Sequence, residues 1–422
     1  MIAASQTLYI ASVCFTLLFA SVICLRSVAL LPIRSSTARA EPNLLQGKKL
    51  PVYTILVPLF HEANMIKNIT DALMAIDYPQ ELLDIKLILE ADDDATVTAA
   101  FSQELPDCFE IVLVPPHPLR TKPKALNFAL PYARGEFVVI FDAEDRPDPQ
   151  QLRKAIHEFG LGPPELVCLQ ASLAYYNTDE NWLTRQFAIK YASLFDAFLP
   201  ANVQLGLPVP LGGTSNHFKI EALCDAGCWD AYNVTEDADL GVRLARLGYQ
   251  VGVLGSVTCE EAVPTLGAWI KQRSRWIKGW LQTWLVHTRE PLNLLRELGI
   301  IKSLAVQIIL FGIIVSAIGY PVFLGVALYK LSHGEFVSQS YGWMDRAIGP
   351  LQLWVLLFGF IVNMAMGWIA VRRRNLKQLN WQILFIPIYW MLISFASWYA
   401  VYQFIFKPFY WEKTNHGGSN HA

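Results

Sequence analysis

The sequence predicts an α/β domain with a mostly parallel sheet, joined to an α-helical membrane region of about four spans. Two observations predict this fold class. Strand-like and helix-like segments alternate through the middle of the 422-residue chain, and four long runs outside the middle contain no Asp, Glu, Lys or Arg. Alternating strands and helices are typical of βαβ units, and an apolar run of about 20 residues is long enough to cross a bilayer.

The membrane region is predicted from the uncharged runs. The chain is 53% hydrophobic and only 17% charged, whereas about 25% charged residues is usual for a soluble domain. The runs are residues 1–25, 303–329, 347–371 and 381–406. A buried core helix needs only about 10–14 apolar residues, so we expect four spans, of which the last three pack together.

The charges beside these runs predict the topology. No Lys or Arg precedes the first run, whereas a secretory signal, the alternative for this run, begins with a basic stretch. Basic residues follow the first and third runs, at Arg26, Arg34, Arg39, Lys48, Lys49 and Arg372–Arg374. By the positive-inside rule, the domain after the first span is cytoplasmic, and the N-terminus and the tail from Lys407 lie outside.

The middle of the chain contains candidate strands and candidate helices. The strands are near-continuous β-branched and aliphatic runs, as buried parallel strands usually are: Tyr53–Leu59, Ile85–Leu89, Glu110–Val114, Phe137–Phe141 and Leu166–Leu169. Helical patterns separate them at Ala63–Ile76, Lys124–Tyr132 and Pro149–Phe159. We therefore expect a first span at 1–33, an α/β domain at 50–262, an amphipathic helix at 263–290, further spans at 301–406 and a tail at 407–422.

Acidic residues follow two of the candidate strands. Asp92 and Asp93 come after the strand ending at Leu89, and Asp142, Glu144 and Asp145 come after the strand ending at Phe141. A solvated turn would explain one such cluster. Two clusters at strand ends favour a polar ligand or a metal, because ligands bind beyond the carboxyl ends of parallel strands.

The second acidic cluster has the composition of a metal site. Carboxylates are the oxygen ligands that Mg²⁺ and Mn²⁺ prefer. Asp142 and Glu144 point the same way in an extended segment, so both can face one ion. We predict these two residues as the metal ligands, with Asp145 as the rival.

Two later segments have helical spacing. In Asn233–Tyr249 the acids Glu236, Asp237 and Asp239 fall in the first turn, where stabilisation of the helix dipole is a sufficient reason for them. In Trp269–Trp284 tryptophans alternate with Lys and Arg just ahead of the second uncharged run. A basic amphipathic helix at the membrane surface is the structural interpretation of that segment.

The cysteines and the net charge exclude other classes of site. The seven cysteines show no paired metal-ligand spacing, and free thiols in a reducing cytoplasm are the simplest interpretation. A formal net charge of −2 shows no excess of positive charge of the kind that binds nucleic acid. We therefore expect no nucleic-acid partner.

Taken in order, six segments resemble a family-2 glycosyltransferase of the membrane-embedded polysaccharide-synthase type. The relatives include the cellulose, hyaluronan, chitin and poly-N-acetylglucosamine synthases. The segments are "ILVPLFHEANMI" (Ile55–Ile66), "EADDDAT" (Glu90–Thr96), "KPKALNFAL" (Lys122–Leu130), "FDAED" (Phe141–Asp145), "TED" (Thr235–Asp237) and "QRSRW" (Gln272–Trp276). The resemblance covers about residues 50–285. It is fullest to bacterial glycosyltransferases of exopolysaccharide or adhesin production, which share "DAEDRPDP", "GGTSNHF" and "PFYWEKT".

The resemblance implies a fold, a location and substrates. The fold is a GT-A type domain that binds a nucleoside-diphosphate sugar, with a UDP-sugar as the expected donor and a glycan as the acceptor. The location is the bacterial inner (cytoplasmic) membrane, crossed several times, with the catalytic domain in the cytoplasm. The expected cofactor is Mg²⁺ or Mn²⁺. The implied reaction inverts the anomeric centre and extends a polysaccharide.

The resemblance also implies roles for site residues. Asp237 is the general base, with Glu236 beside it, and Arg275 stabilises the departing diphosphate. Asp142 and Glu144 hold the metal. The substrate-binding residues are Glu62, Asp92, Asp93, Lys124, Gln272 and Trp276, of which Trp276 offers a flat face to the acceptor sugar. Two departures from the family pattern are Glu144, in place of the usual second Asp, and "PLGGTSNHF" (Pro210–Phe218), which disfavours cellulose as the product.

Two other functions are compatible with parts of the sequence. A single-transfer glycosyltransferase acting on a polyprenyl phosphate would keep the nucleotide and metal motifs but would not need "QRSRW". A catalytically silent membrane scaffold would need neither Asp237 nor Gln272, Arg275 and Trp276. No appended regulatory domain is recognisable, so control or export would need a partner subunit.

Overall fold

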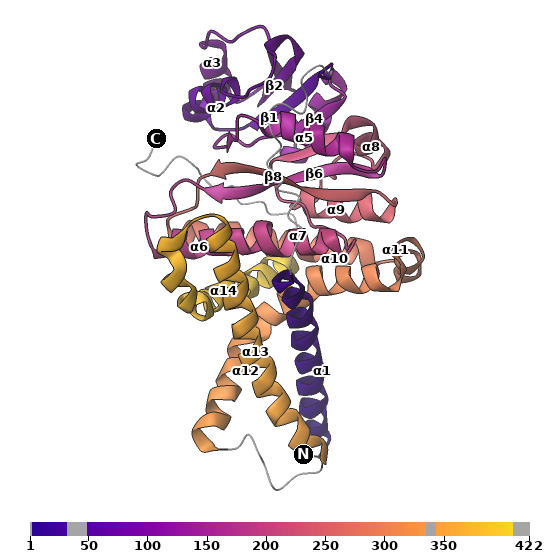
Figure 1. Cartoon of the computed structure of the whole chain (residues 1–422), viewed down its shortest axis with the longest axis vertical. Coiled ribbons are helices and arrows are strands. Elements are labelled where there is room, and N and C mark those ends of the chain that lie inside the picture. Colours follow the sequence, from indigo (N-terminus) through magenta and orange to yellow (C-terminus); the bar gives the residue numbers. More distant parts are fainter. Residues whose placement is uncertain (1, 32–48, 335–342, 408–422) are drawn as a thin grey trace.

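A computed structural model describes residues 2–31, 49–334 and 343–407 (Figure 1). The predictions that rest on Arg34, Arg39, Lys48 and the tail segment 408–422 lie outside these residues. Figure 1 shows a sheet domain at one end, a layer of helices in the middle, and helices α1, α12 and α13 extending away from the sheet. The chain therefore places its soluble and its apolar parts at opposite ends.

Within the described residues, eight strands form one sheet in the order β3-β2-β1-β4-β7-β6-β8-β5. The strands are β1 Tyr53–Leu59, β2 Leu83–Glu90, β3 Phe109–Val114, β4 Phe137–Ile140, β5 Arg146–Pro147, β6 Leu166–Tyr175, β7 Asn216–Lys219 and β8 Gln250–Glu260. β1 to β4 run parallel to one another, with Tyr53 opposite both Leu83 and Phe137. β6 and β8 are also parallel, whereas β7 and β5 run antiparallel to their neighbours. The predicted α/β class is confirmed, and the sheet is mixed.

Helices cover both faces of the sheet. Successive residues of a strand point to opposite faces, and β1 shows the result. Ile55 packs in one cluster with residues of α2 Ile66–Met74 and α5 Gln151–Leu161. Leu56 packs in another cluster with α4 Lys122–Ala129, α8 Ile220–Asp225 and α9 Glu236–Arg246. A short helix, α3 Asp94–Phe101, follows β2.

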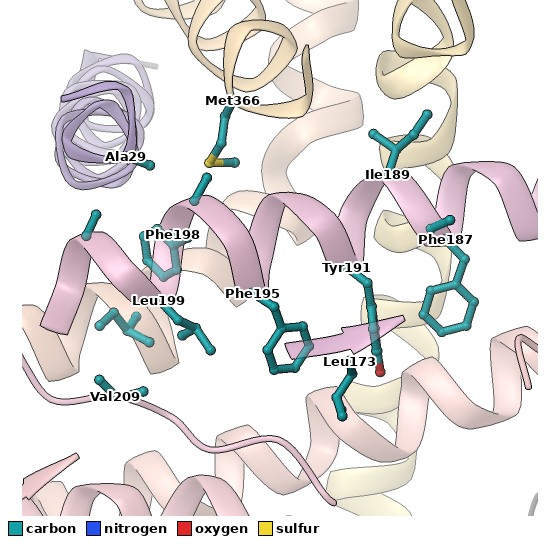
Figure 2. Packing of buried hydrophobic residues seen from close by; sticks show 14 of the residues in the cluster. Ala29, Leu173, Phe187, Ile189, Tyr191, Phe195, Phe198, Leu199, Val209 and Met366 are labelled. Carbon is teal, nitrogen blue, oxygen red and sulfur yellow. The ribbon is translucent and has the colours of Figure 1, made fainter. Parts of the chain in front are cut away.

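A layer of helices joins the sheet to the apolar end. It consists of α6 Trp182–Ser193, a π-helical turn at Leu194–Phe198, α7 Leu199–Gln204 and α10 Leu266–Thr288. Figure 2 shows aromatic residues of this layer, including Phe187, Tyr191 and Phe195, packing with Leu173 of β6. Met366 belongs to the same buried cluster, so one hydrophobic core continues from the sheet into the apolar helices.

Among the described residues, four segments are long and apolar enough to cross a membrane, judged by length and composition. They are Ile10–Leu30, Pro291–His333, Pro350–Arg373 and Lys377–Phe406. Their helices are α1 Ile2–Ser27, α11 Pro291–Val306, α12 Ile313–His333, α13 Trp343–Arg373 and α14 Ile386–Phe406. The number and order agree with the four predicted spans. The second segment is longer than predicted because a π-helical stretch, Gln307–Gly312, continues α11 into α12.

Candidate active site

Carboxylates from three parts of the chain line one cavity of about 590 Å³. Asp142 and Glu144 follow β4, Glu236 and Asp237 begin α9, and Glu260 ends β8. β4 and β8 run in the same direction in the sheet, so their carboxyl ends lie at the same edge, where α9 begins. The structure therefore brings together the predicted metal ligands and the predicted base.

Lys122 supplies a positive charge to this cluster. Its ammonium group is ion-paired with the Asp142 carboxylate and donates a hydrogen bond to the Gly213 carbonyl at 2.6 Å. Burial opposes the charge of Lys122, but the carboxylates of Asp142 and Glu236 outweigh burial and raise its pKa. Lys122 was not among the predicted site residues.

The predicted lysine of the same segment, Lys124, has another partner. Its Nζ atom lies 3.0 Å from both carboxylate oxygens of Glu90, at the end of β2. Lys124 therefore joins α4 to β2. It does not belong to the described residues that line the cavity, although Glu90 does.

Burial changes the protonation of the carboxylates. It raises the pKa of Glu144 to about 7, with the charge of Asp142 adding to the effect. It raises the pKa of Glu236 to about 8, with Asp237 as the next cause, and that of Asp237 to about 6. Burial and the mutual repulsion of the two carboxylates therefore disfavour the state in which both members of this pair are ionised. A carboxylate with a pKa near the working pH suits a general base.

The acidic pair after β4 fits a divalent ion. Asp142 and Glu144 border the cavity side by side, and their like charges would be neutralised by a cation. In the described part of the chain no three His, Cys, Asp or Glu side chains form a metal-binding group. A pair of carboxylates such as Asp142 and Glu144 suits Mg²⁺ or Mn²⁺, because these ions are often held by one or two carboxylates and by substrate phosphates.

Asp145, the rival ligand, is used by the loop itself. Its Oδ2 atom accepts hydrogen bonds from the Asp142 amide, at 2.8 Å, and from the Thr214 hydroxyl. Its Oδ1 atom is buried and has no hydrogen-bond partner in the described structure. Asp145 therefore positions the Asp142 backbone through its Oδ2 atom.

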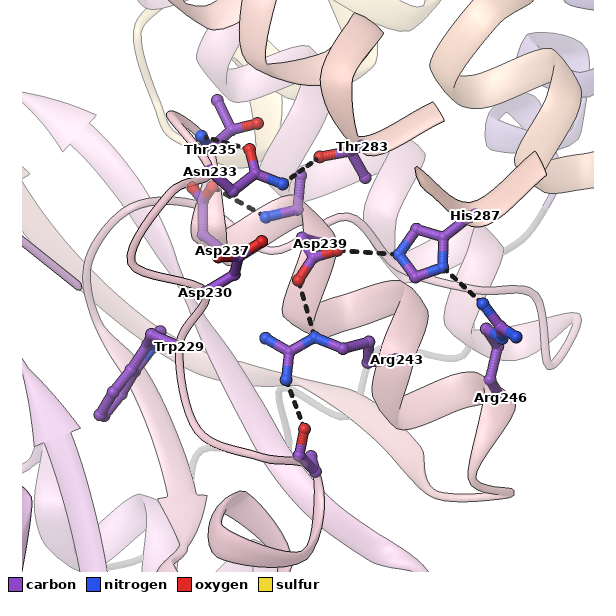
Figure 3. A network of polar contacts seen from close by, with 12 residues as sticks. Trp229, Asp230, Asn233, Thr235, Asp237, Asp239, Arg243, Arg246, Thr283 and His287 are labelled. Atoms are coloured by element: carbon purple, nitrogen blue, oxygen red, sulfur yellow. Dashed lines mark hydrogen bonds and ion pairs between the residues drawn. The ribbon is translucent and has the colours of Figure 1, made fainter. Parts of the chain in front are cut away.

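A polar network fixes the segment that carries Asp237 (Figure 3). The Asp239 carboxylate accepts hydrogen bonds from Arg243 Nε at 2.7 Å and from His287 Nε2 at 2.9 Å. Nearby, the Asn233 side chain donates to the Thr283 hydroxyl at 3.0 Å. Thr283 and His287 belong to α10, so the start of α9 is attached to that helix at two points. Asp239 therefore has specific hydrogen-bond partners, in addition to its place in the first turn of α9, where it stabilises the helix dipole.

The segment "QRSRW" of α10 faces the cavity, as Gln272, Arg275 and Trp276 line it. Burial lowers the pKa of Arg275, while the carboxylates of Glu236 and Asp142 act in the opposite direction. The Trp276 ring lies 6.2 Å from the Tyr191 ring, centroid to centroid. The three predicted residues therefore share the cavity with the carboxylates.

The three residues predicted to bind the nucleotide lie at different distances from the cavity. Glu62 lines the cavity. Asp92 is ion-paired with Arg120, a cavity residue, and so lies at its border. Asp93 is buried, caps α3, and accepts a hydrogen bond from the His61 amide at 2.6 Å. Asp93 therefore shapes the loop after β1 in this structure.

The cavity continues into the apolar helices. Its lining includes Phe19 of α1, Phe323 of α12, Val355 of α13 and Trp390 of α14. All four residues belong to the segments that are long and apolar enough to cross a membrane. One continuous space therefore connects the carboxylates with those helices, past α10.

Comparison with known proteins adds to this geometry. The model of glycosyl transferase family 2 matches residues 54–215, and that of glycosyl transferase family group 2 matches residues 137–406. The probable glycosyltransferase YdaM of Bacillus subtilis (strain 168) is 22% identical over 383 residues, which are 87% of each chain. The mannosyltransferase PcManGT from Pyrobaculum calidifontis, solved with GDP-Man and Mn²⁺, superposes with a TM-score of 0.52 at 18% identity. The superposition covers 85% of this chain and 88% of that one.

The fold and the family models define a glycosyltransferase. The chain belongs to the glycosyl transferase family group 2, whose model matches more than half of its residues. That match includes the acidic segment after β4, α9, α10 and three of the four apolar segments.

Proposed function

We propose that the protein is a membrane-bound inverting glycosyltransferase that adds sugars from a nucleoside-diphosphate sugar to a growing polysaccharide. A UDP-sugar is the expected donor. The observation that carries the proposal is the single cavity that links the carboxylates to the apolar helices through Gln272 and Trp276. A polymer made at the carboxylates would have a route toward the membrane along that cavity.

Asp237 is the base in this proposal. It takes the proton of the acceptor hydroxyl while the hydroxyl oxygen bonds to the anomeric carbon and the bond from that carbon to the diphosphate breaks. Its pKa of about 6 leaves it ionised at neutral pH, and burial keeps water from competing for the proton. Glu236 lies beside it, with a pKa that is raised by burial and by the charge of Asp237.

Cationic side chains stabilise the departing diphosphate. Lys122 and Arg275 line the cavity beside the carboxylates, and a preorganised cation is most effective where water is excluded. Asp142 and Glu144 would hold a divalent ion, which neutralises charge on the leaving group when bound. The Mn²⁺ bound by PcManGT supports such an ion here.

The acceptor lies along α10 in this proposal. Trp276 offers a ring against which a sugar can stack, and Gln272 lies beside it with a buried Oε1 atom that has no partner among the described residues. The domain at 50–262 faces the cytoplasm of a bacterium, where sugar nucleotides are made. The helices of residues 301–406 and α1 cross the inner membrane, and exopolysaccharide is the expected product.

Single transfer to a polyprenyl phosphate is the second candidate function. The apolar lining contributed by Phe19, Phe323 and Val355 favours it, because an isoprenoid tail needs such a surface. It would give the same chemistry at Asp237. The two candidates differ in the size of the product.

The proposal is tested first by replacing the base. Purified protein is supplied with a panel of labelled UDP- and GDP-sugars, and both donor binding and nucleoside-diphosphate release are measured. We expect Asp237→Asn to keep donor affinity and to lose about 10²–10⁴-fold in rate. Asp179→Asn, which changes an exposed carboxylate, is the matched control. An Asp237→Asn variant with more than about a tenth of the wild-type rate would move the role elsewhere.

A further inference from the structure

A second charged group lines the same cavity, and it is cationic. Arg26 of α1, Lys190 of α6 and Arg273 of α10 all border the cavity. Burial lowers the pKa of Lys190 well below its ordinary value, and the positive charges of Arg273 and then Arg26 lower it further. The three cations come from helices far apart in the sequence, yet the positive charges of the two arginines reach Lys190.

Arg273 carries the argument for an anion. It is 5% exposed, and its Nε and Nη2 atoms are buried without a hydrogen-bond partner among the described residues. Rings flank the guanidinium, whose central carbon lies 4.0 Å from the Phe187 centroid and 4.5 Å from the Trp276 centroid. Four aromatic rings compensate part of the buried charge. The two buried donors still lack an acceptor, which a phosphate oxygen would supply.

The protein itself does not supply the anion. In the described part of the chain, Arg26, Lys190 and Arg273 form no salt bridge. Arg26 donates instead to a neutral acceptor, Asn363 Oδ1, at 2.5 Å. Glu260 also lines the cavity, and among the described residues no salt bridge joins it to any of the three cations.

We propose that Arg26, Lys190 and Arg273 bind the phosphate of a membrane lipid. The Nε and Nη2 atoms of Arg273 are neighbouring donors of one planar group, and such a pair matches two oxygens of a phosphate. Arg26 lies within the apolar segment Ile10–Leu30, and a charged residue in such a segment usually marks a functional site.

The walls around these cations select a lipid over a soluble anion. Phe19 and Val22 of α1, Phe323 of α12 and Ile393 of α14 line the same cavity and belong to apolar segments. An apolar tail would lie against these side chains while its phosphate reaches the three cations. An acidic sugar chain would offer carboxylates but would leave the apolar walls without a partner.

The site goes beyond polysaccharide synthesis, and it deepens the second candidate function, whose polyprenyl-phosphate acceptor it would hold. Lipid binding is measured without any sugar nucleotide, so its outcome does not depend on whether the protein makes a polymer. Conversely, a protein that makes no polymer can still bind the lipid. Lipid binding and polysaccharide synthesis therefore fail independently, and binding alone does not establish transfer to the lipid.

The test uses full-length protein, stripped of lipid in a neutral detergent and studied by native mass spectrometry. Polyprenyl phosphate, an anionic glycerophospholipid and zwitterionic phosphatidylcholine are offered at equal concentrations, and millimolar inorganic phosphate is a separate arm. We expect the two anionic lipids to bind about tenfold more tightly than phosphatidylcholine. We expect the double variant Lys190→Met, Arg273→Gln to lose at least about fivefold of that binding. Lys271→Gln, which removes an exposed cation from the same helix, should bind as the wild type does.

Several outcomes would overturn the proposal. They are equal binding of phosphatidylcholine, unchanged binding by the double variant, and displacement of the lipid by inorganic phosphate, which would assign a site for free anions. Preferential binding of an acidic oligosaccharide would also overturn it. Melting curves show whether the double variant folds. If it does not, Arg26→Gln, which changes a partly buried side chain, gives the same comparison.

Discussion

The His287 imidazole donates a hydrogen bond to the Asp239 carboxylate at 2.9 Å, and both residues are 2% exposed. On its other side, His287 Nδ1 faces Arg246 Nη1 at 3.0 Å. The contact joins α10, which carries Arg275 and Trp276, to α9, which begins with Glu236 and Asp237. The proposed base and the proposed acceptor helix are therefore held in one geometry.

Replacing this imidazole should affect both stability and rate. We expect His287→Ala to lose about 1.5–3 kcal/mol of unfolding free energy, because it removes a buried hydrogen bond to a charged group. We also expect a larger fall in kcat than in donor affinity, because the start of α9 loses its attachment. Thermal unfolding and steady-state kinetics measure both effects. His117→Ala, in an exposed loop, is the control, and wild-type values for His287→Ala would contradict the positioning role.

The close approach of α10 to the Asp237 segment makes a second prediction. A Cβ atom on Gly279 would lie 2.5 Å from the Thr235 side chain, whereas one on Gly267 of the same helix would meet nothing within 4 Å. Gly279→Ala must therefore displace the residues before Glu236, and we expect it to lower kcat at least about tenfold. Gly267→Ala, in the first turn of the same helix, meets no such contact and should keep the wild-type rate. Equal rates for the two variants would show that this contact does not position the base.

The raised pKa of Asp237 predicts the pH dependence. A carboxyl base works only when deprotonated, so kcat/KM should rise with pH through an inflection near 6 and then level off. Lys122 lowers the pKa of Asp237, so Lys122→Met should move the inflection to higher pH while reducing the rate. Initial rates at low donor concentration, taken across the pH range in which the protein remains folded, give both profiles. A profile that is flat through pH 6, or an inflection that moves down in Lys122→Met, would contradict the assignment.

The acidic pair after β4 makes a prediction about metal. We expect EDTA to abolish turnover and Mg²⁺ or Mn²⁺ to restore it, and we expect Asp142→Asn to remain inactive after metal is added. Titration of Mn²⁺ in the presence of a nucleoside diphosphate should show weaker binding to Asp142→Asn than to the wild type. Asp71→Asn, which changes an exposed carboxylate, is the control. Full activity in EDTA would exclude the proposed metal role.

Sequence patterns together with the family resemblance could propose much of the candidate site, because its residues stand next to strand ends and helix starts. Asp142 and Glu144 follow a buried apolar run, and Asp237 opens a helix with clear spacing. The patterns could not choose between Lys122 and Lys124. The two residues lie in the same segment, and only the start of α4 at Lys122, together with the Glu90 partner of Lys124, determines which one faces the cavity.

Strands without an apolar run also escaped prediction. β7, Asn216–Lys219, carries His217, which is fully buried and forms a hydrogen bond at 2.7 Å with the Tyr53 hydroxyl. Tertiary partners make this polar strand possible, and they leave no periodic trace in the sequence. β8, Gln250–Glu260, contains two glycines, and Gly252 packs closely on Leu169 of β6. Glu260 was not predicted as a site residue, because the sequence pattern did not reveal β8, the strand that ends at Glu260.

The size of the product tests the central claim most directly. Purified protein in lipid nanodiscs is incubated with each labelled UDP- or GDP-sugar, and the product is separated by size before and after digestion with glycosidases. Chain synthesis predicts a labelled product of many sugars that grows with time and is absent from Asp237→Asn. A labelled lipid that carries a single sugar, with no larger species at any donor concentration, would contradict polysaccharide synthesis and establish single transfer.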